Sequence, residues 1–286
     1  MPFYKIFFFS LIYLCSCEST VNVDNPSYSV DNHLVEMENL NGETLVERFK
    51  TPKGYGRVAL SKGTFGNYLR NFPLKNANAK VKLYDGSDKP NQEAHVAVLD
   101  IDVGSYDLQQ CADAVMRLRA EYLFNSNQKE EISFNFTNGF KADFRTWSKG
   151  NKILVSGNNV SWTPEPSSNS SYASFRKYMK MVFIYAGTAS LEKELHPKNL
   201  SSIQVGDVLI RGGYPGHAVI VMDVAKSKTS GDKIFMLAQS YMPAQDVHVL
   251  KNPSNANLSP WYAVTECEEA VKTPEWTFNK KLIKSF

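Results

Sequence analysis

The 286-residue chain has little of what marks the specialised classes of protein. It contains only four cysteines, its formal net charge is +3, and no block of lysine and arginine stands out along it. So few cysteines exclude a disulfide-dense scaffold, and so small a charge without a basic tract argues against nucleic acid as a partner. Histidine, cysteine and carboxylate residues nowhere fall at metal-ligand spacing, and no internal repeat is evident. We therefore predict no metal and no other cofactor.

The most apolar stretch lies near the amino terminus and is too short to span a bilayer comfortably. Residues 6–14 follow Lys5 and lead into the tetrapeptide LCSC at residues 14–17. A positive residue, a short apolar core and small residues before a cysteine resemble the signal and lipobox of bacterial lipoproteins. The resemblance implies a signal at residues 1–17 and acylation of Cys17, with the lipid bilayer as a partner. The alternative is a plain secretory signal with two incidental cysteines.

The rest of the chain divides into a polar segment and one long region without a linker. Residues 18–50 show no sustained periodicity and predict a flexible tether. Residues 51–286 predict a single α+β domain, in which helices pack on an antiparallel sheet. Helices are expected at residues 64–72, 107–124 and 172–185, and strands at 81–86, 95–103, 131–136, 217–225 and 233–239.

The most distinctive segment is GDVLIRGGYPGH, residues 206–217, which runs directly into the almost wholly apolar stretch 218–225. Its glycines let a backbone or a ligand approach closely, and its proline stiffens the turn. The apolar stretch is typical of a buried strand. We therefore expect His217 at the rim of a rigid sheet, where it could serve as a catalytic base. The alternative is a histidine that only caps the strand and hydrogen-bonds a carbonyl group.

Cys111 has the features of a nucleophile. It falls in the first turn of the helix expected at 107–124, where unpaired amide groups and the helix dipole favour the thiolate. A histidine held across from it could accept the thiol proton and later protonate a leaving group. Two alternatives stay open: Cys111 as a buried core thiol, and a disulfide between Cys111 and Cys267.

A third residue must orient the imidazole of His217 through its other nitrogen. Folding strand 217–225 back onto 233–240 brings Gln239 roughly opposite His217. We therefore assign Gln239 as the orienting residue, while an ordinary buried amide is the alternative.

This order of residues, a helix-borne cysteine, a strand-borne histidine and a polar residue on the next strand, resembles the papain-like amidases and peptidases. Within that class, the order resembles the NlpC-type enzymes in particular, which cleave peptides of bacterial cell walls. The stretch GDVLI at residues 206–210 looks like the Gly-Asp-Leu/Val stretch of that class. The Cys–His interval is longer here, and QQCAD stands at residues 109–113 in place of the usual Tyr/Asp-Cys-Ser pattern. The resemblance implies a papain-like fold and cysteine-hydrolase chemistry.

A second resemblance covers nearly the whole mature chain. It is carried by QQCADAVMRLRAEYL at residues 109–123, GYPGHAVIV at 213–221 and QSYMPAQD at 239–246. These motifs resemble the signature of a bacterial lipoprotein family known as domain of unknown function 4846. The resemblance establishes kinship and carries no activity.

Three further residues are candidates for substrate binding. Tyr241 follows Gln239 in a loop that could line the pocket, although a structural turn is the alternative. Trp147 and Arg145 could form a platform for a carbohydrate, although core or surface packing is the alternative.

The sequence thus predicts a lipid-anchored protein of the bacterial cell envelope, on its periplasmic or surface face. It would act as a cysteine amidase or peptidase on cell-envelope peptides, with Cys111, His217 and Gln239 as its catalytic residues. The first alternative is a non-catalytic lipoprotein that binds a glycan or peptide in the same cleft. The second is a structural envelope component.

Overall fold

The computed structural model of the chain describes residues 38–286. The predicted signal, its Cys17 and most of the predicted tether lie outside the described residues. Within the described range, no helix is both long enough and apolar enough to cross a membrane.

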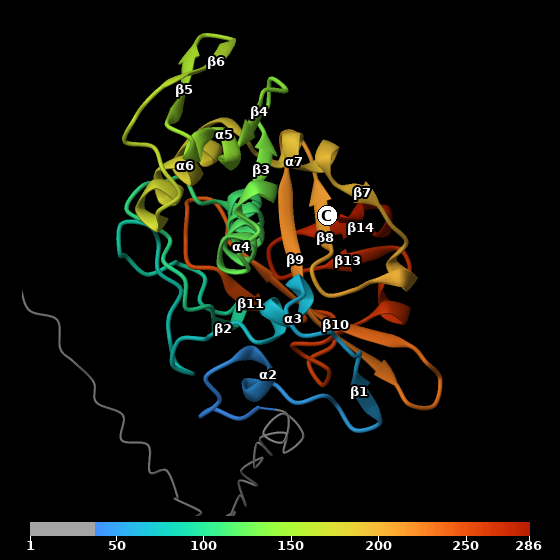
Figure 1. The fold of residues 1–286 in the computed structure, drawn as a ribbon. Coiled ribbons are helices and arrows are strands. Elements are labelled where there is room, and N and C mark those ends of the chain that lie inside the picture. Colours follow the sequence, from blue (N-terminus) through green and yellow to red (C-terminus); the bar gives the residue numbers. More distant parts are fainter. Residues whose placement is uncertain (1–37) are drawn as a thin grey trace, which may run out of the picture. The chain divides into compact units, whose positions relative to one another are not determined.

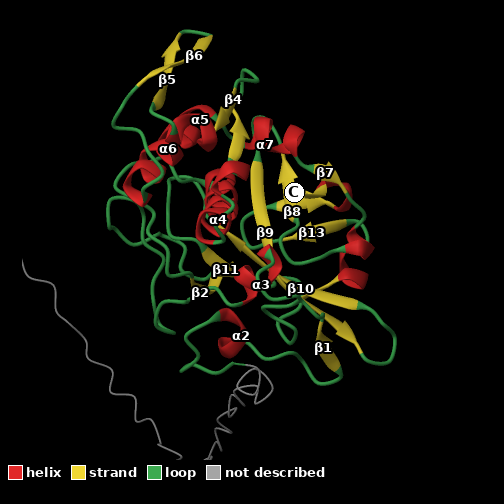
Figure 2. Ribbon diagram, viewed as in Figure 1, coloured by secondary structure: helices red, strands yellow, loops and turns green. Residues whose placement is uncertain are grey.

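A nine-stranded sheet, antiparallel at every pair of strands, forms the centre of the fold (Figures 1 and 2). Its main path runs β2-β11-β10-β9-β8-β15-β7, with β1 paired to β9 and β12 paired to β10. The strands of this sheet are β1 (Tyr55–Arg57), β2 (His95–Val98), β7 (His196–Pro197), β8 (Val208–Arg211), β9 (His217–Ser227), β10 (Lys233–Gln239), β11 (His248–Leu250), β12 (Tyr262–Ala263) and β15 (Ile283–Ser285).

The remaining elements among the described residues are six α-helices, four short 3₁₀ helices and three two-stranded hairpins. The helices are α2 (Leu45–Arg48), α3 (Phe65–Arg70), α4 (Cys111–Asn125), α5 (Phe144–Ser148), α6 (Tyr172–Tyr185) and α7 (Thr188–Glu194). The hairpins pair β3 (Ser133–Asn135) with β4 (Lys141–Asp143), β5 (Asn151–Ser156) with β6 (Asn159–Pro164), and β13 (Ala270–Lys272) with β14 (Thr277–Asn279). The predicted α+β class is confirmed.

Strand β9 is buried on both faces, which explains the apolar run at its residues 218–222. Ala218, Ile220 and Met222 belong to the main core, to which α4 and α6 also contribute. Val219 and Val221 alternate with them and pack into a second core on the other face of the sheet. Since side chains alternate along a strand, a strand between two cores is apolar on both faces. The charged residue in its buried part, Asp223, is paired with Arg57 and Arg70. Helix α4 packs directly on β9, which brings the start of the helix close to the start of the strand.

The folded region begins before residue 51, so the predicted tether is too long. Leu45 and Phe49 are buried in the main core, and a short helix positions them. This helix is held by a hydrogen bond from Thr44 N to Glu47 Oε2, 3.1 Å, and by the Arg48 guanidinium, which donates to the Gly42 carbonyl. A four-residue helix is too short to give a periodic pattern, which is why the sequence did not reveal it.

The predicted elements differ from the structure mostly at their ends. The helix expected at 172–185 is found with those bounds, and the helix expected at 107–124 begins four residues later. The strand expected at 81–86 is absent, because Lys82 and Leu83 form only isolated bridges. The strand expected at 95–103 ends at Val98, since its neighbour β11 has only three residues with which to pair.

Candidate functional site

Cys111 is the first residue of helix α4. The backbone N–H of Gln110, the N-cap residue, donates to Asp113 Oδ2 at 3.1 Å. Asp107, where the sequence placed the start of this helix, lies in the preceding loop: its Oδ1 accepts from Ala244 N at 2.7 Å and from Gln110 Nε2 at 3.0 Å. The helix therefore starts at the cysteine itself, and its free amide groups surround the thiol.

His217 is the first residue of β9, where it pairs with Arg211 of β8. Only 1% of its surface is exposed. Its ring lies 4.7 Å from the ring of Tyr241, 5.2 Å from Trp276 and 5.7 Å from Phe278, measured between centroids. This aromatic surround fixes the imidazole plane and keeps water from most of the ring.

Cys111 and His217 line the same pocket, which has a volume of about 370 Å³. The thiol is half-buried and lies against the backbone of Ala218, the residue after the histidine. The structure thus places both predicted residues at one pocket. The other lining residues come from the loop before α4, the start of α7, the turn at 213–216 and the segments around Tyr241 and Trp276.

Gln239 contacts His217, as the sequence predicted, and its second hydrogen-bond partner determines which atom of the amide faces the histidine. Its Oε1 lies 2.8 Å from His217 Nε2, while its Nε2 donates to Glu275 Oε2 at 2.9 Å. A carboxylate can only accept, so the nitrogen of the amide must face Glu275 and the oxygen must face the histidine. His217 Nε2 therefore carries the proton, and its Nδ1 is left as the basic nitrogen.

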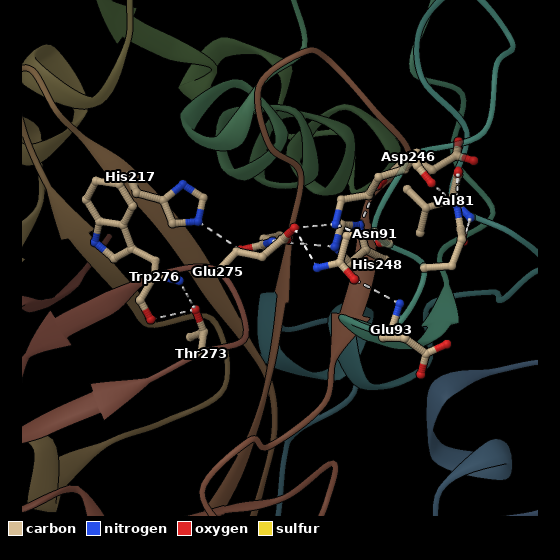
Figure 3. Close-up of polar contacts among 12 residues, drawn as sticks. Val81, Asn91, Glu93, His217, Asp246, His248, Thr273, Glu275 and Trp276 are labelled. Carbon is tan, nitrogen blue, oxygen red and sulfur yellow. Dashed lines mark hydrogen bonds and ion pairs between the residues drawn. The ribbon is translucent and has the colours of Figure 1, made fainter.

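The network continues away from the pocket (Figure 3). Glu275 Oε1 accepts from Lys89 Nζ at 2.5 Å and from Asn91 Nδ2 at 3.2 Å. The second amide hydrogen of Gln239 faces His248 Nε2 at 3.5 Å, and His248 Nδ1 donates to the Asp246 carbonyl at 2.9 Å. Each donor along this chain faces an acceptor, so the orientation of the Gln239 amide is consistent throughout.

Burial makes both reactive groups neutral. It lowers the pKa of His217 to about 4, and the Gln239 hydrogen bond and the charge of Glu275 only partly oppose it. Burial also raises the pKa of Cys111 to about 11, against the backbone hydrogen bond from Ala218 and with a further contribution from Asp113. The helix start was expected to favour the thiolate, and here desolvation outweighs it. At neutral pH the site holds a thiol and a neutral imidazole.

Two of the three predicted substrate-binding residues lie elsewhere. Tyr241 lines the pocket. Trp147 is a core residue with 5% exposure, and its Nε1 donates to Ser174 Oγ at 2.9 Å, so it offers no face to a sugar. Arg145 is on the same helix, α5, lies 3.8 Å from Glu130 and does not line the pocket. The carbohydrate platform is therefore not part of this site.

The predicted alternative of a disulfide is not found. Cys111 and Cys267 are both free, and Cys267 is buried in the second core, on the other face of the sheet from α4. Among residues 38–286, no group of three or more histidine, cysteine, aspartate or glutamate residues is arranged to hold a metal ion.

A family model described as domain of unknown function (4846) matches residues 45–285. The chain belongs to this family. The matched range includes every residue of the site, from Lys89 to Trp276. Neither the curated proteins nor the solved structures that were searched contain a match.

Sequence reasoning missed three residues of this family member's site: Asp113, Glu275 and Trp276. Glu275 and Trp276 lie in the turn between β13 and β14, far along the chain from Cys111 and His217. No periodicity marks them, because a short hairpin brings Trp276 to the pocket and Glu275 to Gln239 behind it. Asp113 is the third residue of a helix that starts at Cys111, and from there its carboxyl group accepts from the N-cap amide. The sequence placed the helix start four residues earlier, which hid this role.

Proposed function

We propose that the protein is a papain-like cysteine hydrolase that acts on amide bonds, with Cys111 as nucleophile and His217 as base and acid. The observation that carries the proposal is the His217–Gln239 hydrogen bond in the pocket that Cys111 lines. It leaves the basic nitrogen of the imidazole free, which is the form that a general base requires.

The reaction follows from the neutral resting state. As the Cys111 sulfur bonds to the carbonyl carbon, the thiol proton passes to His217 Nδ1. The amide C–N bond then breaks, and the amine leaves with the proton from the imidazolium. Water next attacks the thioester and gives a proton to Nδ1. The carboxylic acid is released as that proton returns to the sulfur, which restores both groups.

The oxyanion of the tetrahedral intermediate needs donors that are already in place. Helix α4 begins at the nucleophile, so the unpaired N–H groups of its first turn are the nearest donors, and the helix dipole adds to their effect. Gly216, which precedes the histidine, lets the turn close tightly: a Cβ there would lie 2.3 Å from the Gly213 carbonyl oxygen.

The arrangement of one helix and two strands around the pocket supports the papain-like part of the proposal. A cysteine at a helix start packs beside a strand that begins with the histidine, and the adjacent strand carries the amide residue. The cell envelope as the site of action, with a lipid anchor at Cys17 and envelope peptides as substrates, rests on the lipobox-like sequence and on the NlpC resemblance.

The test is hydrolysis of a defined mixture of cell-wall stem peptides by the purified chain, followed by the appearance of new primary amines. We expect release that is abolished in Cys111→Ala and in His217→Ala. The control is Cys267→Ala, which removes the thiol in the second core and should leave release unchanged. Equal release by the parent chain and Cys111→Ala would overturn the proposal.

A second candidate function is binding of a peptide without cleavage, favoured by the raised pKa of the Cys111 thiol. It predicts saturable binding of the same peptides with no new amines, and the same affinity in Cys111→Ala.

A further inference from the structure

The pocket that Cys111 lines contains carboxyl groups but no basic side chain. Asp107 and Asp113 are among its lining residues, and no lysine or arginine of the described chain is. Burial keeps two further titratable groups of the pocket, Cys111 and His217, uncharged at neutral pH. Negative charge is therefore the only side-chain charge that the pocket walls can present.

Asp107 is exposed at the pocket and held in one orientation. Its Oδ1 accepts from Ala244 N at 2.7 Å and from Gln110 Nε2 at 3.0 Å. The other carboxylate oxygen has no hydrogen bond from residues 38–286. A carboxylate fixed by one oxygen and free at the other is preorganised to bind a cation.

Asp113 is 6% exposed and lies two residues after the nucleophile. Its Oδ2 accepts from the Gln110 amide, but its Oδ1 is buried without a partner in the described structure. Leaving such an atom unsatisfied is costly, and a group with several N–H donors would satisfy it. Two carboxyl groups thus flank Cys111, one at the mouth of the pocket and one buried in its wall.

Positive charge is found in a neighbouring groove. Lys177 and Lys180 line that groove, which shares Leu108 and Phe183 with the pocket. These cations lie beyond the two shared apolar side chains and do not line the wall around Cys111. The separation of charge favours a ligand whose cationic part enters the pocket.

We propose that the pocket selects an amide substrate that carries a primary ammonium group beside the scissile bond, bound by Asp107 and Asp113. The ammonium could be the amino terminus of a peptide or the side-chain amine of a diamino acid. That the bound molecule is an amide substrate rests on the proposed function. The preference for a cation does not, because it follows from the lining residues alone.

The first test measures charge preference without any hydrolysis. Cys111 is treated with methanethiosulfonate reagents of similar size that are cationic, neutral or anionic, and modification is followed by mass spectrometry of the Cys111 peptide. After correction for intrinsic reactivity with a free thiol, we expect the cationic reagent to react about tenfold or more faster than the anionic one. Asp107→Asn should lower this ratio severalfold, since asparagine keeps an acceptor and removes the charge. Burial raises the pKa of the Asp113 carboxyl well above its usual range, so Asp113→Asn removes only the charge that this carboxyl gains when a cation lies beside it, and it should lower the ratio less.

The matched control is Glu130→Gln, which removes an exposed carboxylate from the surface outside the pocket and should leave the ratio unchanged. Equal rates for cationic and anionic reagents, or a ratio that neither aspartate variant changes, would overturn the inference. Charge selectivity without peptide hydrolysis would overturn the proposed function and leave this inference intact.

The second test identifies the amine. Lysine amide and its Nα-acetyl and Nε-acetyl forms are compared for protection of Cys111 against the neutral reagent. Loss of protection on Nα-acetylation assigns the α-ammonium, and loss on Nε-acetylation assigns the side-chain ammonium. Protection by lysine amide acetylated at both nitrogens, which has no ammonium group, would contradict recognition of an ammonium.

Discussion

The network behind His217 predicts that Glu275 controls the protonation pattern of the imidazole. The Gln239 Nε2–Glu275 hydrogen bond, 2.9 Å, fixes which end of the amide faces the histidine. Hydrogen bonds to charged groups contribute about 1.5–3 kcal/mol. Replacing Glu275 by leucine should therefore lower the population ratio of the two amide orientations by about 10- to 150-fold, toward equality. Only the weak contact with His248, 3.5 Å, then favours the productive one.

The same substitution also breaks an ion pair, and that effect must be separated from the first. The Lys89 and Glu275 side chains are 6% and 16% exposed, so Glu275→Leu leaves a buried ammonium unpaired. Breaking such a pair costs about 3 kcal/mol. For a domain of this size, that lowers Tm by about 6–12 °C. The double variant Lys89→Met/Glu275→Leu removes both charges and should recover much of this stability, because the uncompensated charge is gone.

The decisive readout is the histidine tautomer, observed by ¹H–¹⁵N correlation spectra of protein labelled at histidine. The parent chain should show His217 protonated at Nε2. The single and the double variant should both show a mixture, with slower modification of Cys111, although only the single variant is strongly destabilised. If the tautomer and the reactivity recover together with Tm in the double variant, Glu275 acts only on stability and the reasoning is refuted.

Three further predictions concern the same residues. Because the pKa of Cys111 is about 11, the rate of its alkylation by iodoacetamide should rise about tenfold per pH unit from pH 7 to 10. A rate that is already constant above pH 6 would indicate a thiolate–imidazolium ion pair instead. Burial lowers the pKa of His217 to about 4, below the unfolded value of about 6.5. The unfolded chain then binds more protons in that window, so stability should fall between pH 6.5 and 4, and urea unfolding of His217→Phe should show a smaller loss. Gly216→Ala places a Cβ 2.3 Å from Gly213 O and 2.5 Å from Thr188 Oγ1, so this variant should lower the free energy of unfolding by about 1–3 kcal/mol. The control is Gly56→Ala, whose Cβ would meet only Lys228 Cε, at 3.7 Å, and which should not show this clash.

The sequence predicted the parts of the site that local patterns encode. The apolar run that follows His217 in β9 predicted its position at the start of a buried strand, and folding that strand back on β10 brought Gln239 near it. The register was imprecise: Ala238 pairs with Ile220, so Gln239 reaches His217 diagonally rather than from directly opposite. The polar side chain spans that offset, which is why the contact was predicted correctly.

Other features depend on tertiary contacts that no local pattern carries. Glu275 enters the site from a hairpin that pairs only with itself, and Trp147 is buried because α5 packs on α6. The neutral state of Cys111 also follows from burial, while the sequence showed only the helix start, which favours the opposite charge state. Burial of individual side chains was thus the main quantity that the sequence left undetermined.

The central claim is that Cys111 forms a covalent bond with an acyl group and that His217 supports both halves of the reaction. It is tested most directly by mixing the protein with an aminoacyl p-nitrophenyl ester and following p-nitrophenol release together with the intact mass. We predict a burst of release, an acyl adduct on the Cys111 peptide, and loss of that burst in His217→Ala and Cys111→Ala. The absence of any adduct on Cys111, or equal acylation in His217→Ala, would contradict the account.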